Sequence, residues 1–238
     1  EISNKYAKKI SKNLLVYSKS LNIEKEFEDN IYWVEKIKTA LEDDRIIVHF
    51  QPIFNNFTKK IEKYEALVRL IDENGTTIYP NSFLNIAKKS KQYIDITKVV
   101  ISKSFEKFKN SEFEFSINFT VEDILDKELN NYLIRKIKEY NIGHKLVVEI
   151  VESEKITEYQ FVYDFIEKIK LYKCKVAIDD FGSGYSNFEY LIKINADYVK
   201  IDGSIIKRIN EDENALEIVK SIINFAEKMK FKTIAEFV

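Results

Sequence analysis

The chain contains 238 residues, which is enough for one large domain or two small ones. Its 38 basic and 39 acidic residues leave a formal net charge of −1 and form no long block of one sign, so a basic cleft for polymeric nucleic acid is not expected. No apolar run approaches the roughly 20 residues that a membrane-spanning helix needs. The start at Glu1 has neither an initiator methionine nor the apolar core of a signal peptide. We therefore expect a fragment of a longer protein.

Cysteine and histidine are scarce, which limits the kinds of metal site. The single cysteine, Cys174, excludes an internal disulfide and fits a reducing cytoplasm, although the full-length parent could carry a membrane anchor. Its apolar neighbours predict a buried thiol rather than a nucleophile. The two histidines, His49 and His144, lie too far apart for a His-rich zinc site. Any bound metal is therefore expected to have oxygen ligands, which favours Mg²⁺ or Mn²⁺ over Ca²⁺.

The spacing of apolar residues predicts helices first and a strand–helix alternation afterwards. Two stripes at helical spacing occupy the first forty residues: Ile2, Tyr6, Ile10, Leu14 and Tyr17, then Phe27, Ile31, Val34, Ile37 and Leu41. From residue 46 onward we expect strands at 46–50, 61–70, 113–118, 146–150, 175–179, 198–201 and 232–236. The clearest helices between them are 121–140, which stops at Asn141-Ile142-Gly143, 158–172 and 214–230. The alternation predicts an α/β fold with parallel strands, and this number of strands favours a (β/α)8 barrel.

Polar side chains occupy the ends of most of the predicted strands. In chain order they are Glu65, Asn118, Glu149, Asp179 with Asp180, Lys200 and Glu236. In a (β/α)8 barrel the carboxyl ends of the strands converge on one mouth, where active sites form. One carboxylate there is usually a solvated surface group, but several beside strongly apolar neighbours are costly unless they are paired or bind metal. The set therefore predicts one shared site.

Converging carboxylates with one amide and one lysine indicate a site for hard cations. Two ions about 3.5–4 Å apart can clamp a phosphoryl group and lower the pKa of the attacking water. The competing chemistry on such a barrel is glycoside hydrolysis by two carboxylates, which leaves Asn118, the adjacent aspartates and Lys200 without a role. Residues 179–184 add a tight loop after a strand, whose glycines permit backbone conformations that other residues resist.

Seven short motifs resemble those of the EAL family of cyclic di-GMP phosphodiesterases. Glu65-Ala66-Leu67-Val68-Arg69 resembles the signature that names the family, and Gln51-Pro52-Ile53 is similar to its upstream motif. The others follow in the family's order: Asn118-Phe119-Thr120, Glu149-Ile150-Val151-Glu152-Ser153, the loop 179–184, Lys200-Ile201-Asp202 and Ala235-Glu236. Each motif alone is weak evidence, but seven in order are specific. The resemblance implies a barrel that opens one phosphodiester of cyclic di-GMP to give linear pGpG.

The resemblance also implies roles for individual residues. With Asp179 as the bridge between two Mg²⁺ or Mn²⁺ ions, the metal ligands would be Glu65, Asn118, Glu149, Asp179, Asp180 and Glu236. Lys200 would position or activate the attacking water, so the catalytic set would be Lys200, Glu65, Asp179, Asp180 and Glu236. Gln51 and Arg69 would bind the substrate, and Glu152 would stabilise the loop 179–184. Ca²⁺, with its longer and looser coordination, is expected to inhibit.

Some positions depart from the family's pattern. Leu70 replaces a common tryptophan, Ser183 a common threonine, and Phe237 a frequent glycine beside Glu236. The family has further elements after the position of Val238, so residues 38–238 are expected to form a barrel that lacks its last strand and helix. Residues 1–37 are expected to form a helical segment or linker. Within them, Tyr6-Ala7-Lys8-Lys9 and Val16-Tyr17 resemble the end of a GGDEF domain.

The sequence leaves two other functions open. An EAL-like receptor would bind cyclic di-GMP without cleaving it, although such proteins usually lose metal ligands that this chain retains. A purely structural or dimerising segment of a signalling protein would bind neither metal nor nucleotide. For the enzyme, the expected partners are cyclic di-GMP, a second copy of the chain in a homodimer, and an upstream sensory or GGDEF domain.

Overall fold

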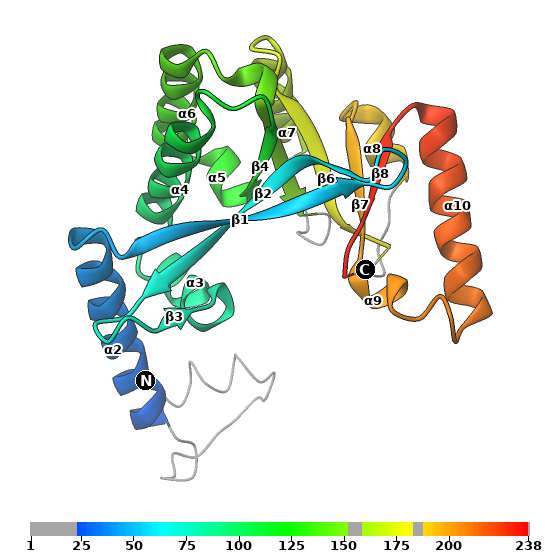
Figure 1. Cartoon of the computed structure of the whole chain (residues 1–238). Helices are drawn as coiled ribbons and strands as arrows, with labels where there is room; N and C mark the ends of the chain where they lie inside the picture. The colour runs from blue at the N-terminus through cyan, green and yellow to red at the C-terminus, as the bar shows by residue number, and fades with distance from the viewer. Residues whose placement is uncertain (1–22, 152–158, 183–187, 238) are drawn as a thin grey trace. The chain divides into compact units, whose positions relative to one another are not determined.

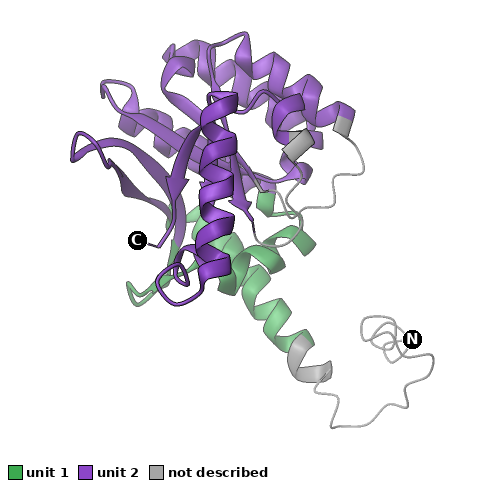
Figure 2. Cartoon of the chain, turned by 90° about the vertical axis from the view of Figure 1, so that its right-hand side faces the viewer, with its two compact units in different colours: residues 1–46, 70–93 green, residues 47–69, 94–238 purple. Residues whose placement is uncertain are grey.

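A computed structural model describes residues 23–151, 159–182 and 188–237 of the chain. The apolar stripe predicted over residues 2–17, as well as Glu152 and Ser183, lies outside these ranges. The chain divides into two compact units, which Figure 2 shows in different colours. Unit 1 comprises residues 1–46 and 70–93, and unit 2 comprises residues 47–69 and 94–238.

Among the residues that the structure describes, unit 1 contains two helices and a short strand pair. Helix α2 (Ile23–Glu42) confirms the second predicted stripe, and it packs on α3 (Pro80–Lys89). Strand β3 (Thr77–Ile78) pairs in the antiparallel direction with the last two residues of β2. Arg45 ties these pieces together, because its guanidinium donates to the Ile71 carbonyl at 2.9 Å.

Unit 2 contains the main sheet and most of the helices. Its strands are β1 (Ile46–Asn55) and β2 (Lys60–Ile71), which begin or end in unit 1, then β4 (Glu114–Phe119), β5 (Leu146–Val151), β6 (Lys175–Phe181), β7 (Tyr198–Ile201) and β8 (Lys232–Ala235). Its helices are α4 (Tyr93–Phe108), α5 (Val121–Leu125), α6 (Lys127–Tyr140), the 3₁₀ turn η2 (Gly143–Lys145), α7 (Tyr159–Lys170), α8 (Phe188–Lys193), α9 (Gly203–Ile206) and α10 (Glu213–Met229). The alternation of strand and helix that the sequence predicted is therefore present.

The strands follow one another across the sheet in the order β1-β2-β4-β5-β6-β7-β8. From β2 to β8 each neighbouring pair is parallel. The register places Asn118 beside Glu149 on adjacent strands. Because parallel strands end at the same edge, this order brings the polar strand ends to one side of unit 2.

The two faces of the sheet have different surroundings. On β4, Phe115 points toward the helical layer and stacks on Phe108 of α4 with ring centroids 4.6 Å apart, while Phe119 packs against Phe165 of α7 at 5.9 Å. Figure 1 shows α4, α6 and α7 beside these strands. Since side chains alternate along a strand, Ser116 and Asn118 point to the opposite, inner face. This inner face is called the lumen below.

Helix ends follow local capping rules. The predicted helix 121–140 is two helices, because Asp126 has an extended backbone and its carboxylate accepts the Leu129 amide at 2.7 Å to begin α6. Helix α6 ends at Asn141, whose φ of 49° is left-handed, which confirms the predicted stop. Gly143 follows because a Cβ at that position would lie 2.0 Å from the Tyr172 carbonyl oxygen.

Cys174 is buried at 4% exposure, and burial raises the pKa of its thiol to about 12. The prediction of a buried thiol is thereby confirmed. Among the helices that the structure describes, none is both long and apolar enough to cross a membrane.

Candidate metal centre

Lys200 lies at the centre of a carboxylate cluster in the lumen of unit 2. Its ammonium nitrogen contacts one oxygen from each of four side chains: Asp179 at 2.9 Å, Glu149 at 3.0 Å, Glu236 at 3.0 Å and Glu65 at 3.2 Å. These residues come from β2, β5, β6, β7 and the end of β8. Three strands separate β2 from β7 in the sheet order, so the contact between Lys200 and Glu65 shows that the sheet curls. The sequence prediction that these strand ends meet is confirmed.

The cluster is buried and strongly charged. Lys200 is 2% exposed and Glu149 is 1% exposed. Burial alone would lower the pKa of Lys200, but the nearby carboxylate charges, with Glu149 first, outweigh burial and hold that pKa above its usual range. Conversely, burial raises the pKa of Glu149 to about 7, and the charges of Glu65 and Asp179 act in the same direction. The ammonium therefore stays charged, while full ionisation of the acids is costly.

A second group of acids lies at the outer side of the cluster. Asp179, Asp180 and Glu236 each offer one oxygen within 4.8 Å of the others. Burial raises the pKa values of Asp180 and Glu236, and the charge of Asp179 raises both further. A bound cation would remove this mutual repulsion.

The backbone after β6 turns sharply to present these side chains. Asp180 has a φ of 56° and its amide donates to the Asp179 carboxylate at 3.1 Å. Gly182 follows with a φ of 99°, and a Cβ there would also lie 2.7 Å from the Ile205 side chain. The first part of the predicted loop 179–184 thus has the conformation that its glycine was expected to permit.

The donor set fits hard divalent cations. Five carboxylates and one ammonium surround the lumen mouth, namely Glu65, Glu149, Asp179, Asp180, Glu236 and Lys200. When fully ionised they carry an excess of four negative charges, which two divalent ions would balance. All the ligand atoms are oxygens, the preference of Mg²⁺ and Mn²⁺.

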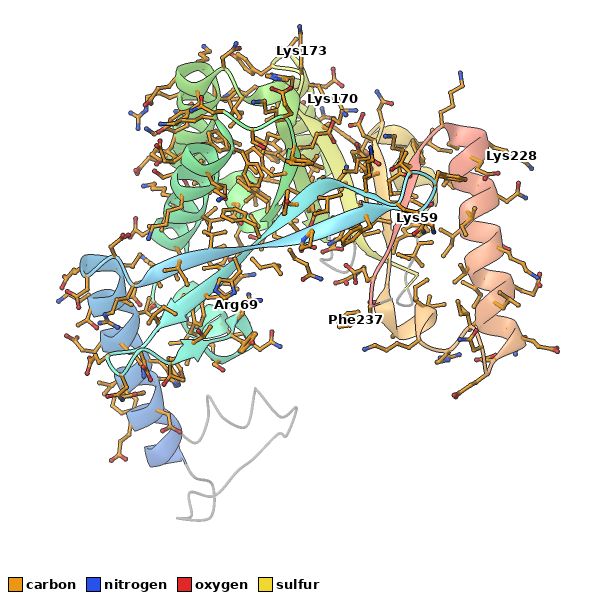
Figure 3. The ribbon with its side chains drawn as sticks, in the orientation of Figure 1. Lys59, Arg69, Lys170, Lys173, Lys228 and Phe237 are labelled. Atoms are coloured by element: carbon orange, nitrogen blue, oxygen red, sulfur yellow. The ribbon has the colours of Figure 1, made fainter. Side chains whose placement is uncertain are left out.

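Of the remaining predicted residues that the structure describes, one contacts this cluster and the other two lie on β1 and β2. Asn118 is part of it, because its amide nitrogen donates to Glu65 at 3.2 Å. Gln51 is exposed on β1, and Arg69 is half-buried on β2, where Figure 3 labels it. The Arg69 guanidinium donates to the Val68 carbonyl at 2.7 Å. The structure does not describe Glu152, so its role in the loop stays a prediction.

Two features were not fully anticipated. Asp202 lies beside Asp180 and raises the pKa of that carboxyl, although the sequence analysis gave Asp202 no role. Its position two residues after Lys200 at the end of β7 was the available signal. Phe237, labelled at the end of β8 in Figure 3, has a left-handed φ of 52° and the Lys207 ammonium 3.8 Å from its ring centroid. This backbone conformation favours glycine, so the phenylalanine that replaces the family's glycine adopts a conformation that is unfavourable for a residue with a side chain.

Comparisons with known proteins agree with this geometry. The EAL domain family matches residues 34–238. Cyclic di-GMP phosphodiesterase PdeA of Borreliella burgdorferi is 30% identical over 209 residues, covering 85% of this chain and 31% of that protein. Cyclic di-GMP phosphodiesterase PdeF of Escherichia coli is 28% identical over 225 residues, covering 92% of this chain and 30% of that protein. The chain therefore spans about a third of the length of these two relatives.

A solved structure shows the same fold. The FimX EAL domain of Xanthomonas citri, in complex with c-diGMP, has a TM-score of 0.80 and 25% identity, covering 90% of this chain and 86% of that one. The expected α/β, TIM-like barrel architecture is thus confirmed for the curled sheet and its helices. Because the family match extends over most of its length, this chain belongs to the EAL domain family.

Proposed function

We propose that this chain is a metal-dependent phosphodiesterase domain that hydrolyses cyclic di-GMP to linear pGpG. The observation that carries the proposal is the buried Lys200 ammonium surrounded by carboxylates from four strands, beside a second acidic group. The substrate is supported by PdeA and PdeF, both of which are cyclic di-GMP phosphodiesterases.

The proposed metals are two Mg²⁺ or Mn²⁺ ions. Their ligands would be Glu65, Asn118, Glu149, Asp179, Asp180 and Glu236, with Asp179 shared between the two sites. When bound, the ions would lower the pKa of the attacking water and offset the charge of the phosphate. The protein holds the ligands in place before binding, since Asn118 orients Glu65 and the left-handed turn at Asp180 aims adjacent carboxylates at one point.

Lys200 acts as a hydrogen-bond donor in this proposal. In the absence of cations the surrounding carboxylates keep the pKa of its ammonium high, so Lys200 is a hydrogen-bond donor in that state. It can orient the attacking water, or donate to the phosphate oxygen on which charge develops. The proton that the water loses would pass to a carboxylate that is not a metal ligand or to solvent.

Substrate contacts would come from Gln51 and Arg69. Arg69 shares strand parity with Glu65 on β2, so both side chains can face the lumen. A guanidinium suits a phosphate because its donors form a planar fork. For Glu152 we keep the role of stabilising the loop 179–184. On the wider protein, we propose residues 1–37 as a linker to an upstream sensory or GGDEF domain, residues 38–238 as the EAL domain, a cytoplasmic location and a homodimer.

The test is turnover by the purified chain with cyclic di-GMP and Mg²⁺ or Mn²⁺, with the products separated by chromatography. A version extended beyond Val238 should be assayed beside it. Metal-dependent pGpG from either version supports the proposal, and Glu65→Ala should abolish it because a metal ligand is lost. Glu217→Ala, which changes a glutamate in an exposed ion pair on α10, is the matched control and should retain full activity.

Two outcomes would contradict the proposal. Tight binding of cyclic di-GMP without product from either version would assign the chain as a receptor. Full activity of Glu65→Ala would remove the metal-ligand assignment. Replacing Mg²⁺ by Ca²⁺ should suppress turnover, because Ca²⁺ accepts longer and more variable coordination than this compact cluster offers.

A further inference from the structure

A second charged network lies in the lumen, nearer to the beginnings of the strands than the metal centre is. It consists of Lys63 on β2, Glu114 on β4, Lys175 on β6 and Tyr198 on β7, and is called the floor network here. Glu114, Lys175 and Tyr198 are the first residues of their strands and Lys63 lies two residues before Glu65 on β2, whereas the proposed metal ligands lie further along each strand.

Glu114 is the centre of the floor network. One of its carboxylate oxygens accepts the Tyr198 hydroxyl at 2.8 Å and lies 3.3 Å from the Lys63 ammonium, while the other pairs with Lys175. The Lys63 nitrogen also lies 3.1 Å from the centroid of the Tyr198 ring. Lys63 is 3% exposed and Tyr198 is 2% exposed. The Lys63–Tyr198 contact is therefore shielded from water, whereas the side chains of Glu114 and Lys175 are 21% and 35% exposed.

The protonation states suit this arrangement. Burial raises the pKa of the Tyr198 hydroxyl, and the charge of Glu114 raises it further, so the hydroxyl remains a donor. Burial would raise the pKa of Glu114 as well, but Lys175 and Lys63 outweigh burial and keep that carboxyl ionised. The Tyr198–Glu114 bond is thus a charge-assisted hydrogen bond that joins β7 to β4, although two strands separate them in the sheet.

Strand β7 needs such an anchor because its own pairing is short and interrupted. It has four residues, of which Tyr198 and Lys200 both point into the lumen. On the β6 side, Tyr198 pairs with Ala177, but the register shifts further along and leaves no partner opposite Lys200. On the other side, Lys200 pairs with Ile234 of β8. The regular ladder therefore fixes Tyr198 from both sides and Lys200 from one side only.

We propose that the floor network positions Lys200, with Tyr198 as the positioning residue. Held by Glu114 and Lys63, Tyr198 sets how far β7 projects along the lumen, and the ammonium two residues later then meets its four carboxylates at 2.9–3.2 Å. Small displacements matter, because a shift of about 1 Å at a catalytic group can lower a rate by about 100-fold. The kinetic part of this inference rests on the proposed function of Lys200, whereas the geometric part does not.

The main test is Tyr198→Phe, which keeps the ring over Lys63 and removes only the hydroxyl. The matched control is Tyr140→Phe, because the Tyr140 hydroxyl also donates to a glutamate, Glu106, at 3.2 Å, but on the exposed helical layer. We expect kcat of Tyr198→Phe to fall about 10- to 100-fold with KM changed less than about twofold. The control should match the unsubstituted chain.

A second readout is independent of turnover. In protein labelled with ¹⁵N-lysine, the Nζ resonance of Lys200 should move in Tyr198→Phe and in Glu114→Gln, but not in Tyr140→Phe. Glu114→Gln also covers the case in which one variant fails to fold. If neither the unsubstituted chain nor its extended version is active, the proposed function fails, while the resonance still tests the positioning.

Several results would overturn the inference. An unmoved Lys200 resonance in both floor variants would show that the network does not position the ammonium. Equal kcat values for Tyr198→Phe and the unsubstituted enzyme would show that the network does not affect catalysis. A lower melting temperature with unchanged kcat per folded molecule would assign the floor network a purely structural role.

Discussion

Replacing Lys200 with methionine should destabilise the metal-free protein far more than a typical lysine substitution. Methionine keeps an unbranched side chain of similar length but removes the ammonium that contacts four carboxylates within 3.2 Å. Lys200 is 2% exposed and the side chains of its four partners are 1–18% exposed, so water can replace the ammonium only in part. The substitution therefore leaves buried like charges facing one another.

The size of the effect follows from this burial. Removing one partner of a buried ion pair costs about 3–5 kcal/mol, because the remaining charge is uncompensated. For a domain of this size, each kcal/mol lowers the melting temperature by about 2–4 °C, so the expected loss is about 6–20 °C. By contrast, Lys220→Met removes an ammonium that is 59% exposed and paired with Glu217, a surface pair worth about 0–1 kcal/mol. It is the control.

The assay is thermal unfolding in EDTA and again with saturating Mn²⁺. Ligands that bind only the folded state raise its stability by mass action. Cations should therefore stabilise Lys200→Met by more degrees than the unsubstituted protein, since they also relieve the repulsion that the missing ammonium leaves. If the melting temperature of Lys200→Met in EDTA equals that of Lys220→Met, the carboxylates are not held together as described. If Mn²⁺ raises both melting temperatures equally, charge compensation is not the cause.

Three further predictions concern unit 2 away from the metal centre. Cys174 should resist alkylation in native protein and react in denaturant, because burial raises its pKa to about 12. The stability that this thiol contributes is complete below the pKa of the unfolded thiol and is lost as pH rises toward 12. Alkylation of the native protein at pH 8 would contradict the prediction. Gly143→Ala should lower the free energy of unfolding by about 1–3 kcal/mol in urea, since its Cβ would lie 2.0 Å from the Tyr172 oxygen; an unchanged midpoint would refute the close approach. Asp126→Ala should cost about 1 kcal/mol by losing the cap on Leu129, whereas Asp126→Asn should recover most of it.

Strands β4 to β8 could be predicted from the sequence because they are short and rich in apolar residues, whereas the ten-residue β1 continues five residues past its expected end. Strand β7 occupies the residues expected for it, and β2, β4, β5, β6 and β8 differ from expectation by one or two residues at either end. The predicted helix 121–140 was wrong in one respect, since periodicity cannot show that Asp126 leaves helical geometry to cap the next helix. The two-residue strand β3 carries too little pattern to be recognised.

Convergence of the candidate site was predictable for a different reason. In parallel strands connected by helices, the carboxyl ends lie on one side whatever the sequence between them. Glu65 and Glu236 could therefore be placed together across 170 positions of chain without any knowledge of helix packing. The rule gives a shared mouth but no distances. That Lys200 is central, and that Asp202 lies near enough to Asp180 to raise its pKa, depends on how tightly the sheet curls.

The floor network shows where sequence patterns stop being informative. Lys63, Glu114 and Lys175 stand at the beginnings of strands, where charged residues ordinarily face solvent, and nothing local distinguishes them from the many other charges of the chain. They become partners only because the curled sheet brings β2, β4 and β6 around Tyr198.

The two networks also explain each other's charge. Around Glu114 an acid is surrounded by cations, whereas around Lys200 a cation is surrounded by acids. Lys63 and Glu65 lie two residues apart on β2 and therefore face the same side of the sheet, but they carry opposite charges and contact different networks: Lys63 contacts Glu114, and Glu65 contacts Lys200. The net positive charge of the floor network attracts the net negative charge of the metal centre. This attraction would lower the free-energy cost of ionising the carboxylates when no cation is bound. The floor network then contributes twice, through the position of β7 and through its charge.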